Sequence, residues 1–242
     1  MRSKMGSESE AMAEQNSMEA LAKLEHRQTL ILHRISNLEL KYLPNLDSPP
    51  SSVPSDGADD DTVARLSAIL RTNAVNDFSF KRVPSDYYDW ALEARRDVLD
   101  AASIDHLCKS IVLVNTQAPS HVVDCSDRNN SKYYIVVVQY TAKFNAEAVK
   151  SFLYSLNDGK IAKKKFNLRL APEETSVKLT GYEHNGVTCI GMKTDIPVIL
   201  DEAIVKLNPD YFWLGGGEID LKLGIRTSEF INFVKPFIIK CS

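Results

Sequence analysis

Glycine is scarce in this chain and unevenly placed. Only 10 of the 242 residues are glycine, and six of these lie between residues 181 and 217. Cysteine is scarcer, and the four cysteines form no CxxC pair and show no metal-ligand spacing. The sequence also lacks an apolar run near 18 residues and a recognisable signal peptide, so we expect a protein of a reducing compartment without a membrane-spanning helix.

Positive charge is not in excess either. The formal net charge is −3, with 6 Lys and Arg against 11 Asp and Glu in residues 1–61, and 23 against 21 in residues 62–242. The second segment is not broadly basic, so we expect no DNA partner, and any RNA contact must come from a local patch. Glutamates soon follow the opening MRSK, whereas organelle transit peptides are poor in acids, so the expected location is the cytoplasm.

The N-terminal quarter predicts a tail, a helix and a linker. Residues 1–17 are polar and are expected to be a disordered tail. Residues 18–43 predict an amphipathic coiled-coil helix, because apolar residues recur at heptad spacing. Residues 44–61 are rich in Pro, Ser and Asp and predict a linker. The helix needs a partner surface, so we expect residues 18–42 to self-associate or to bind another helical protein, with folding back onto the domain as the alternative.

Residues 62–242 predict one globular domain in which helices and strands are mixed without a regular βαβ repeat. This pattern favours an α+β fold with a mixed sheet. Asn145 predicts the cap of a helix over 146–156, and Pro172 opens a short helix that ends at Thr180-Gly181. Asp86 predicts the cap of a helix over 87–102. Further helices are expected at 62–71 and 227–233, and strands at 78–83, 111–115, 133–141, 166–170 and 236–239.

The glycines between residues 181 and 217 form three groups, namely Thr180-Gly181, the segment Gly186–Gly191, and Gly215-Gly216-Gly217. Glycine lets backbone approach a ligand closely, at a cost of roughly 0.5–1 kcal/mol inside a regular element. The concentration therefore predicts a pocket built from main-chain groups. A set of tight β-turns is the alternative. Short alternating apolar segments between the groups predict strands.

Four short motifs follow one another within residues 78–240, namely Cys108-Lys109-Ser110, LTGY at 179–182, GVTCIG at 186–191 and GGGEIDL at 215–221. Together they resemble the YbaK / prolyl-tRNA-synthetase-associated editing domain family. They match the family's early-strand lysine, its threonine-glycine loop, its glycine-rich loop and its last, glycine-rich motif. The resemblance implies an aminoacyl-tRNA deacylase that hydrolyses the ester of mischarged tRNA in trans, with no metal and no organic cofactor.

The resemblance also implies the roles of individual residues. Lys109 would be catalytic, because a cation beside the scissile carbonyl stabilises the developing oxyanion; a strand-end lysine reaching solvent is the alternative. Asp220 would orient water or the α-amino group, with a turn-adjacent carboxylate as the alternative. The implied substrate-binding residues are Thr180, Gly181, Gly186, Val187, Thr188, Cys189, Gly191, Gly215, Gly216 and Gly217.

Two positions depart from the family pattern. Cys189 stands where the family usually has proline, which predicts a less rigid loop and a broader choice of small aminoacyl groups. Leu214 stands where some members have serine. Cys189 is interpreted as a small apolar wall, and a Cys189–His184 dyad is the less favoured reading.

The dense basic run suits a weak contact with the backbone of the tRNA acceptor end, with a solvated face as the alternative; it consists of Lys160, Lys163, Lys164, Lys165 and Arg169. Two other functions stay open. One is a catalytically silent module that binds the tRNA acceptor end. The other is a scaffold protein that acts through its N-terminal helix.

Overall fold

A computed structural model of the chain describes residues 59–242 and, before them, only Gln28, which is helical. The chain divides into two units, residues 1–55 and 56–242, and the fold described below is that of the second unit. The predicted tail, nearly all of the predicted coiled-coil helix and the linker up to residue 58 lie outside the described residues.

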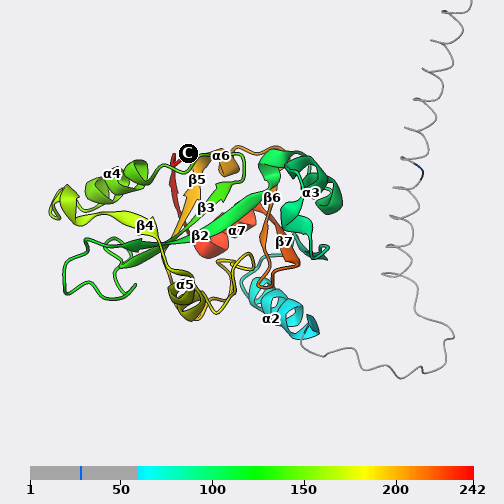
Figure 1. Cartoon of the computed structure of the whole chain (residues 1–242), viewed down its shortest axis with the longest axis horizontal. Helices are drawn as coiled ribbons and strands as arrows, with labels where there is room; N and C mark the ends of the chain where they lie inside the picture. The colour runs from blue at the N-terminus through cyan, green and yellow to red at the C-terminus, as the bar shows by residue number, and fades with distance from the viewer. Residues whose placement is uncertain (1–27, 29–58) are drawn as a thin grey trace, which may run out of the picture. The chain divides into compact units, whose positions relative to one another are not determined.

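Within residues 59–242, the strands form a five-stranded and a three-stranded sheet (Figure 1). The larger sheet is mixed, because its central strand β3 is antiparallel to β2 and parallel to β5. This confirms the predicted α+β fold with a mixed sheet. In spatial order its strands are β4 (Leu168–Leu170), β2 (Cys108–Asn115), β3 (Tyr133–Gln139), β5 (Val198–Asp201) and β8 (Phe237–Ile239).

The smaller sheet is antiparallel and carries part of the candidate site. Its strands are, in spatial order, β1 (Phe78–Arg82), β7 (Leu221–Arg226) and β6 (Tyr211–Gly215). Leu107, just before β2, forms an isolated bridge with Trp213 of β6. The bridge links the two sheets and brings the end of β6 beside the start of β2.

Strand β3 explains why the chain has two apolar cores. Its residues Tyr134–Val138 are all fully buried, as expected for a central strand covered on both faces. Side chains alternate between the faces with period 2. Ile135 and Val137 join the core that includes the smaller sheet, whereas Val136 and Val138 join the core under helix α4 (Ala146–Leu156).

The helix signals in the sequence were accurate where a local cap defines the helix. The side chain of Asn145 accepts hydrogen bonds from the main-chain N–H groups of Glu147 and Ala148, as predicted for the cap of α4. Helix α5 (Glu173–Thr180) begins after Pro172 and ends at Gly181, whose φ is +82°. The other described α-helices are α2 (Asp59–Thr72), α3 (Leu92–Leu99), α6 (Glu202–Val205) and α7 (Thr227–Val234).

The helix predicted over 87–102 is wrong in its first half. A 3₁₀ turn at Tyr87–Asp89 is followed by extended backbone, and α3 begins only at Leu92. The Asp86 side chain makes no capping hydrogen bond. The break buries Tyr87, and the guanidinium of Arg95 donates to the carbonyls of Tyr88 and Trp90, which satisfies acceptors in the broken segment.

The region of residues 182–197 also differs from its prediction. It consists of turns and irregular backbone, whereas short strands were expected between the glycine groups. That expectation is met further along, by β5 and β6 between the second and third groups. The glycine-rich segment 186–191 is therefore a loop that is held by its neighbours. These neighbours include the loop 215–218 and helix α2.

Candidate active site

A cavity of about 370 Å³ lies beside β2. Its lining comes from strand β2, from the turn before α3, from helix α5, from the loop after it and from the end of β6. The residues are Tyr88, Cys108–Val112, Tyr140, Leu170, Ala171, Glu173, Ser176, Val177, His184, Asn185, Val187 and Gly215. Three predicted site residues, Lys109, Val187 and Gly215, therefore meet at one cavity.

Lys109 lies in β2 opposite Val138 of β3 and is partly exposed at the cavity. Its Nζ atom lies 5.4 Å from the centre of the Tyr140 ring. A cation over an aromatic face is attracted to the ring without being neutralised by it. The ammonium can therefore still interact with a negatively charged or polarised oxygen in the cavity.

The two glycine-rich loops pack backbone against backbone. A Cβ atom on Gly215 would lie 2.4 Å from the carbonyl oxygen of Val187, and one on Gly186 would lie 3.0 Å from the main chain of Glu218. The N–H of Gly217 donates to the carbonyl of Gly186 at 2.9 Å. Glycine is thus needed here because two loops approach each other closely. This contact places Val187 and Gly215 in the same wall of the cavity.

Other predicted binding residues shape these loops without lining the cavity. The hydroxyl of Thr180 donates to the carbonyl of Ser176 and accepts from the N–H of Tyr182. Gly191 has φ of +65°, and a Cβ there would lie 2.9 Å from Leu66 of α2. Gly181, Thr188 and Gly216 are likewise outside the cavity lining. Thr188 and Gly216 are buried, whereas Gly181 is exposed.

Cys189 is buried and lines a different cavity, together with Cys125. Burial raises the pKa of the Cys189 thiol to about 12. The thiol therefore stays protonated at neutral pH and is a poor nucleophile. His184, by contrast, is exposed and lines the cavity beside Lys109. The two residues of the less favoured dyad thus line different cavities.

Asp220 lies outside the cavity lining and contacts Arg82 of β1. Both of its carboxylate oxygens accept from the Arg82 guanidinium at 3.0 Å, and Glu218 pairs with the same guanidinium at 2.9 Å. The Asp220 carbonyl accepts from the N–H of Val83. In this structure Asp220 joins the glycine-rich turn to β1.

Sequence reasoning missed Lys222, which lies behind the cavity in β7. Only 4% of this residue is exposed. Its Nζ atom donates to the Tyr88 hydroxyl at 2.6 Å and to the carbonyl of Ile219 at 2.8 Å. In the sequence, LKLGIR alternates like an ordinary strand, a pattern that predicts a lysine side chain facing solvent. The burial comes from the aromatic turn at Tyr87–Asp89, which lies more than 130 positions earlier, so no local signal could have identified it.

Burial changes the acid–base properties of this cluster. Desolvation lowers the pKa of Lys222 to about 8, the nearby Asp220 opposing the shift and Arg95 adding to it. Burial also raises the pKa of Tyr87, Tyr88 and Tyr140. At neutral pH the three phenols are therefore protonated.

A family model described as the aminoacyl-tRNA editing domain matches residues 99–233, which is more than half of the chain. The chain belongs to the aminoacyl-tRNA editing domain family. This confirms the resemblance seen in the sequence. No curated protein matches the chain in sequence.

Solved structures agree with the editing-domain fold. A protein proposed to be a trans-editing enzyme for prolyl-tRNA synthetase superposes with a TM-score of 0.57 at 17% identity, over 79% of this chain and 99% of that one. A hypothetical protein superposes with a TM-score of 0.54 at 16% identity, over 74% and 98%. A scaffold from computational epitope grafting gives 0.56 at 14% identity, over 75% and 96%. At these identities the likeness concerns the fold.

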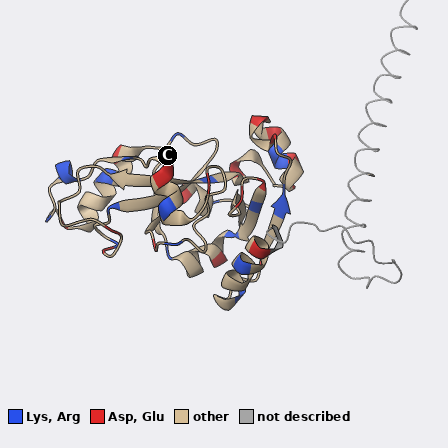
Figure 2. Cartoon of the chain, turned by 60° about the horizontal axis from the view of Figure 1, so that its bottom comes forward, with Lys and Arg blue, Asp and Glu red and all other residues tan. Residues whose placement is uncertain are grey.

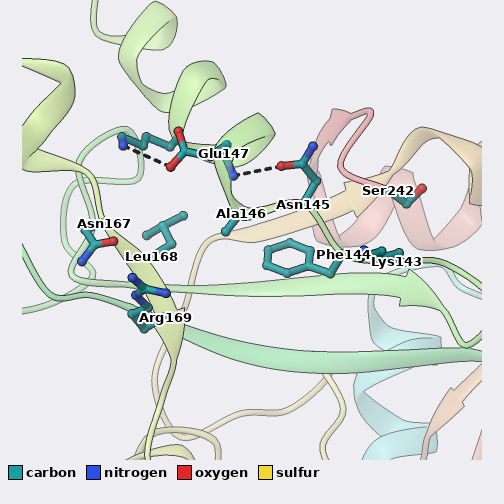
Figure 3. A pocket seen from close by; sticks show the side chains of 10 residues that line it. Lys143, Phe144, Asn145, Ala146, Glu147, Asn167, Leu168, Arg169 and Ser242 are labelled. Carbon is teal, nitrogen blue, oxygen red and sulfur yellow. Dashed lines mark hydrogen bonds and ion pairs between the residues drawn. The ribbon is translucent and has the colours of Figure 1, made fainter.

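Basic and acidic residues are interspersed over the described part of the editing domain (Figure 2). Of the predicted basic run, Lys163–Lys165 form an exposed 3₁₀ turn, and Lys160 pairs with Asp158 at 3.5 Å. Arg169 lines a second cavity, of about 620 Å³, between β4 and the start of α4 (Figure 3). Lys143 and Lys150 line it too, and Lys150 pairs with Glu147 at 3.1 Å. The lining of this second cavity therefore carries three basic side chains and the carboxylate of Glu147.

Among residues 59–242, no group of three or more His, Cys, Asp and Glu side chains is placed to hold a metal ion. In the same part of the chain, no helix combines the length and the apolar character that crossing a membrane requires.

Proposed function

We propose that this editing domain is an aminoacyl-tRNA deacylase that acts in trans on mischarged tRNA. The observation that carries the proposal is the position of Lys109, whose ammonium lies at the wall of a cavity shared with both glycine-rich loops. Membership of the aminoacyl-tRNA editing family supports it.

In the proposed reaction, water attacks the carbonyl carbon of the ester that joins the amino acid to the terminal ribose. Negative charge develops on the carbonyl oxygen, and the Lys109 ammonium stabilises it. The bond from the carbonyl carbon to the ribose oxygen then breaks, and a proton passes to that oxygen. The products are the free amino acid and tRNA with its terminal hydroxyl restored.

Two of the main-chain donors in the glycine-rich turn are already occupied. The N–H of Gly216 donates to the carbonyl of Leu221, and the N–H of Gly217 donates to the carbonyl of Gly186, both at 2.9 Å. The first bond closes the turn between β6 and β7, and the second joins the two glycine-rich loops, so neither N–H is free for a substrate oxygen. The Lys109 ammonium is therefore the main group that stabilises the oxyanion in the proposed reaction.

The size of the cavity supports a small aminoacyl group as substrate. About 370 Å³ is near the lower end of the range for ligand pockets. Ile111, Val112 and Val187 supply apolar lining, and Glu173 supplies a carboxylate. We propose that Glu173 attracts the α-ammonium group of the aminoacyl ester. The predicted role of Asp220 in this step stays a prediction, since its carboxylate is engaged with Arg82.

The tRNA would contact the protein through phosphates near the acceptor end. We place this contact at the cavity lined by Arg169, Lys143 and Lys150, with Lys163–Lys165 as a further exposed cluster. Phosphate contacts of this kind make affinity depend on salt. Residues 18–42 would mediate self-association or binding to a helical protein, and the cytoplasm is the proposed location.

Binding without hydrolysis remains a second candidate function. It is favoured by one observation, namely that Gly216 and Gly217 offer no free N–H to an oxyanion. A panel of tRNAs charged with different amino acids separates the two functions. The deacylase proposal expects release of a small amino acid well above the spontaneous rate. Tight binding of the same tRNA without release would favour the silent module.

A further inference from the structure

We propose that Lys222 is a positioning residue of this pocket, which acts through the Tyr88 hydroxyl to fix Asn185 and the loop segment 184–187. The kinetic part of this inference rests on the proposed deacylase function. The structural part does not.

Two short hydrogen bonds carry the inference. Lys222 Nζ lies 2.6 Å from the Tyr88 hydroxyl oxygen, and that oxygen lies 2.6 Å from the carbonyl of Asn185. The phenol has one hydrogen, and the carbonyl can only accept it. The hydroxyl must therefore accept from Lys222. The two bonds connect strand β7, the aromatic turn and the pocket loop.

The loop at the end of this connection needs support. Asn185 has φ of +66°, in the left-handed region that non-glycine residues seldom occupy. Its neighbours His184 and Val187 line the cavity, and the carbonyl of Gly186 accepts from Gly217. The Tyr88 hydroxyl is thus a fixed point for a backbone that would otherwise relax toward commoner conformations.

The surroundings of Lys222 indicate that its ammonium positions the Tyr88 hydroxyl and does not stabilise the folded domain. Its hydrogen-bond acceptors, the Tyr88 hydroxyl and the Ile219 carbonyl, carry no negative charge. The rings of Tyr88 and Tyr87 lie 4.4 Å and 5.2 Å from Nζ. Burying an ammonium without a carboxylate in contact is unfavourable. A methionine could cover the same strand surface without that desolvation.

The charged and titratable groups that surround Lys222 come from several elements. On β1, the cross-strand partner Lys81 pairs with Asp100 at 2.6 Å. Asp220 precedes β7 and pairs with Arg82.

Arg95 of α3 lies near the rings of Tyr87, Tyr88 and Tyr140. Burial raises the pKa of these phenols and of Cys108. Because the pKa of Lys222 is lowered to about 8, its ammonium loses its proton before these phenols and this thiol as pH rises.

The inference has a kinetic consequence. Since the segment 184–187 forms one wall of the pocket, loosening it weakens the hold on the aminoacyl group more than it changes the chemical step. A loss of this kind raises KM with less change in kcat. It also reduces the discrimination between aminoacyl groups of different size.

The test uses the full chain with Lys222→Met, Tyr88→Phe and the double variant. Lys81→Met is the matched control, because it removes one lysine charge from the neighbouring strand at the paired position. Amide hydrogen exchange is followed at Gly186 and Gly217, whose N–H groups donate to Glu183 and Gly186. We expect each single variant to speed this exchange about 10-fold and to lower kcat/KM about 10-fold, mainly through KM, as for loss of one charged hydrogen bond. The double variant should be no worse than the poorer single variant.

A pH profile adds a readout that a purely structural role would not move. With the spontaneous hydrolysis subtracted, kcat/KM of the wild type should fall above about pH 8 as the Lys222 ammonium is lost. The Lys222→Met profile should lack this step.

The inference is overturned if Lys222→Met and Lys81→Met behave alike in exchange, or if the effects of Lys222→Met and Tyr88→Phe simply add. If Lys222→Met does not fold, Tyr88→Phe alone decides, because unchanged exchange at Gly186 would remove the connection. If the wild type hydrolyses no aminoacyl-tRNA, the proposed function fails, and the exchange measurements still decide this inference.

Discussion

Gly215 and Val187 are so close that a Cβ atom on Gly215 would lie 2.4 Å from the Val187 carbonyl oxygen. The contact joins the end of β6 to the loop before Cys189, and both residues line the cavity beside Lys109. The wall of the pocket is therefore defined by a contact between two main-chain segments.

Gly215→Ala should destabilise the domain, because the new methyl group meets main chain that cannot move away. We expect a loss of about 1–3 kcal/mol in the free energy of unfolding, as for overpacking. Denaturant unfolding measures it. A variant as stable as the wild type would show that the two loops are not held together as described.

Lys222→Met should change how stability depends on pH. The pKa of Lys222 is about 8 in the folded state and near 10.5 when unfolded, so between these values the unfolded state binds more protons. The desolvation penalty is therefore present below pH 8 and is relieved as pH rises toward 10.5. Relative to Lys222→Met, the wild type should gain on the order of 3 kcal/mol between pH 7 and pH 10.

The measurement is the free energy of unfolding of both proteins across this range. The buried cysteines and tyrosines oppose the effect at high pH, because their raised pKa values make the unfolded state lose protons first. They are common to both proteins and cancel in the difference. If the free energy of unfolding changed with pH in the same way in both proteins, the burial of a charged Lys222 would be contradicted.

Cys189 should react slowly with thiol reagents in the native protein. Its pKa of about 12 leaves little thiolate at pH 8, and its side chain is buried. Cys125 is only half-buried and should be alkylated first. Mass spectrometry after iodoacetamide treatment identifies the order, with a denatured sample as control. Rapid labelling of Cys189 would contradict this prediction, because it requires an accessible thiol that is readily deprotonated.

Glu173→Gln should lower kcat/KM for deacylation more than Asp220→Asn does. Glu173 lines the cavity, whereas the Asp220 carboxylate is engaged with Arg82. In Asp220→Asn, loss of the exposed ion pair with Arg82 should change the free energy of unfolding by only about 0–1 kcal/mol. Steady-state kinetics of both variants decide between the carboxylates. A larger loss for Asp220→Asn would support the role that the family resemblance assigns to it.

Replacing Arg169 and Lys143 by alanine should raise KM for tRNA and reduce its dependence on salt. Each lost phosphate contact lowers the slope of log affinity against log salt by about 0.7–0.9. Lys206→Ala is the matched control, since this exposed lysine pairs with Glu202 at 3.1 Å. Kinetics at several salt concentrations measure the slope. The same slope for the double variant and the control would place the RNA contact elsewhere.

The sequence predicted what short-range chemistry determines. Asn145 marks the cap of α4 because its side chain bonds the first free N–H groups of that helix, and Gly181 ends α5 through its positive φ. The mixed sheet also followed from the order of the predicted elements. Lys109 and Gly215 were implied as site residues by the family resemblance, and the structure places both at one cavity. The broken helix after Asp86 was not predicted, because the Tyr88 side chain of the broken segment is held by Lys222 and Asn185, which are distant in sequence.

Long-range packing decided the remaining features of the site. Lys222 is buried by aromatic residues of a segment far away in sequence, and the partner of Asp220 is Arg82 of β1. The spacing of residues in a single sequence predicts neither of these two contacts. Glu173, the first residue of α5, was not among the predicted site residues, and the tertiary fold places it at the cavity.

The central claim is that Lys109 stabilises the oxyanion during ester hydrolysis, and Lys109→Ala tests it most directly. The measurement is single-turnover deacylation of the best tRNA substrate, with the fold checked by thermal unfolding and with Lys206→Ala as a control for loss of a surface charge. The account predicts a rate loss of about 10²–10³-fold with the fold intact, as for removal of one oxyanion-stabilising group. A folded Lys109→Ala protein that deacylates at the wild-type rate would contradict it.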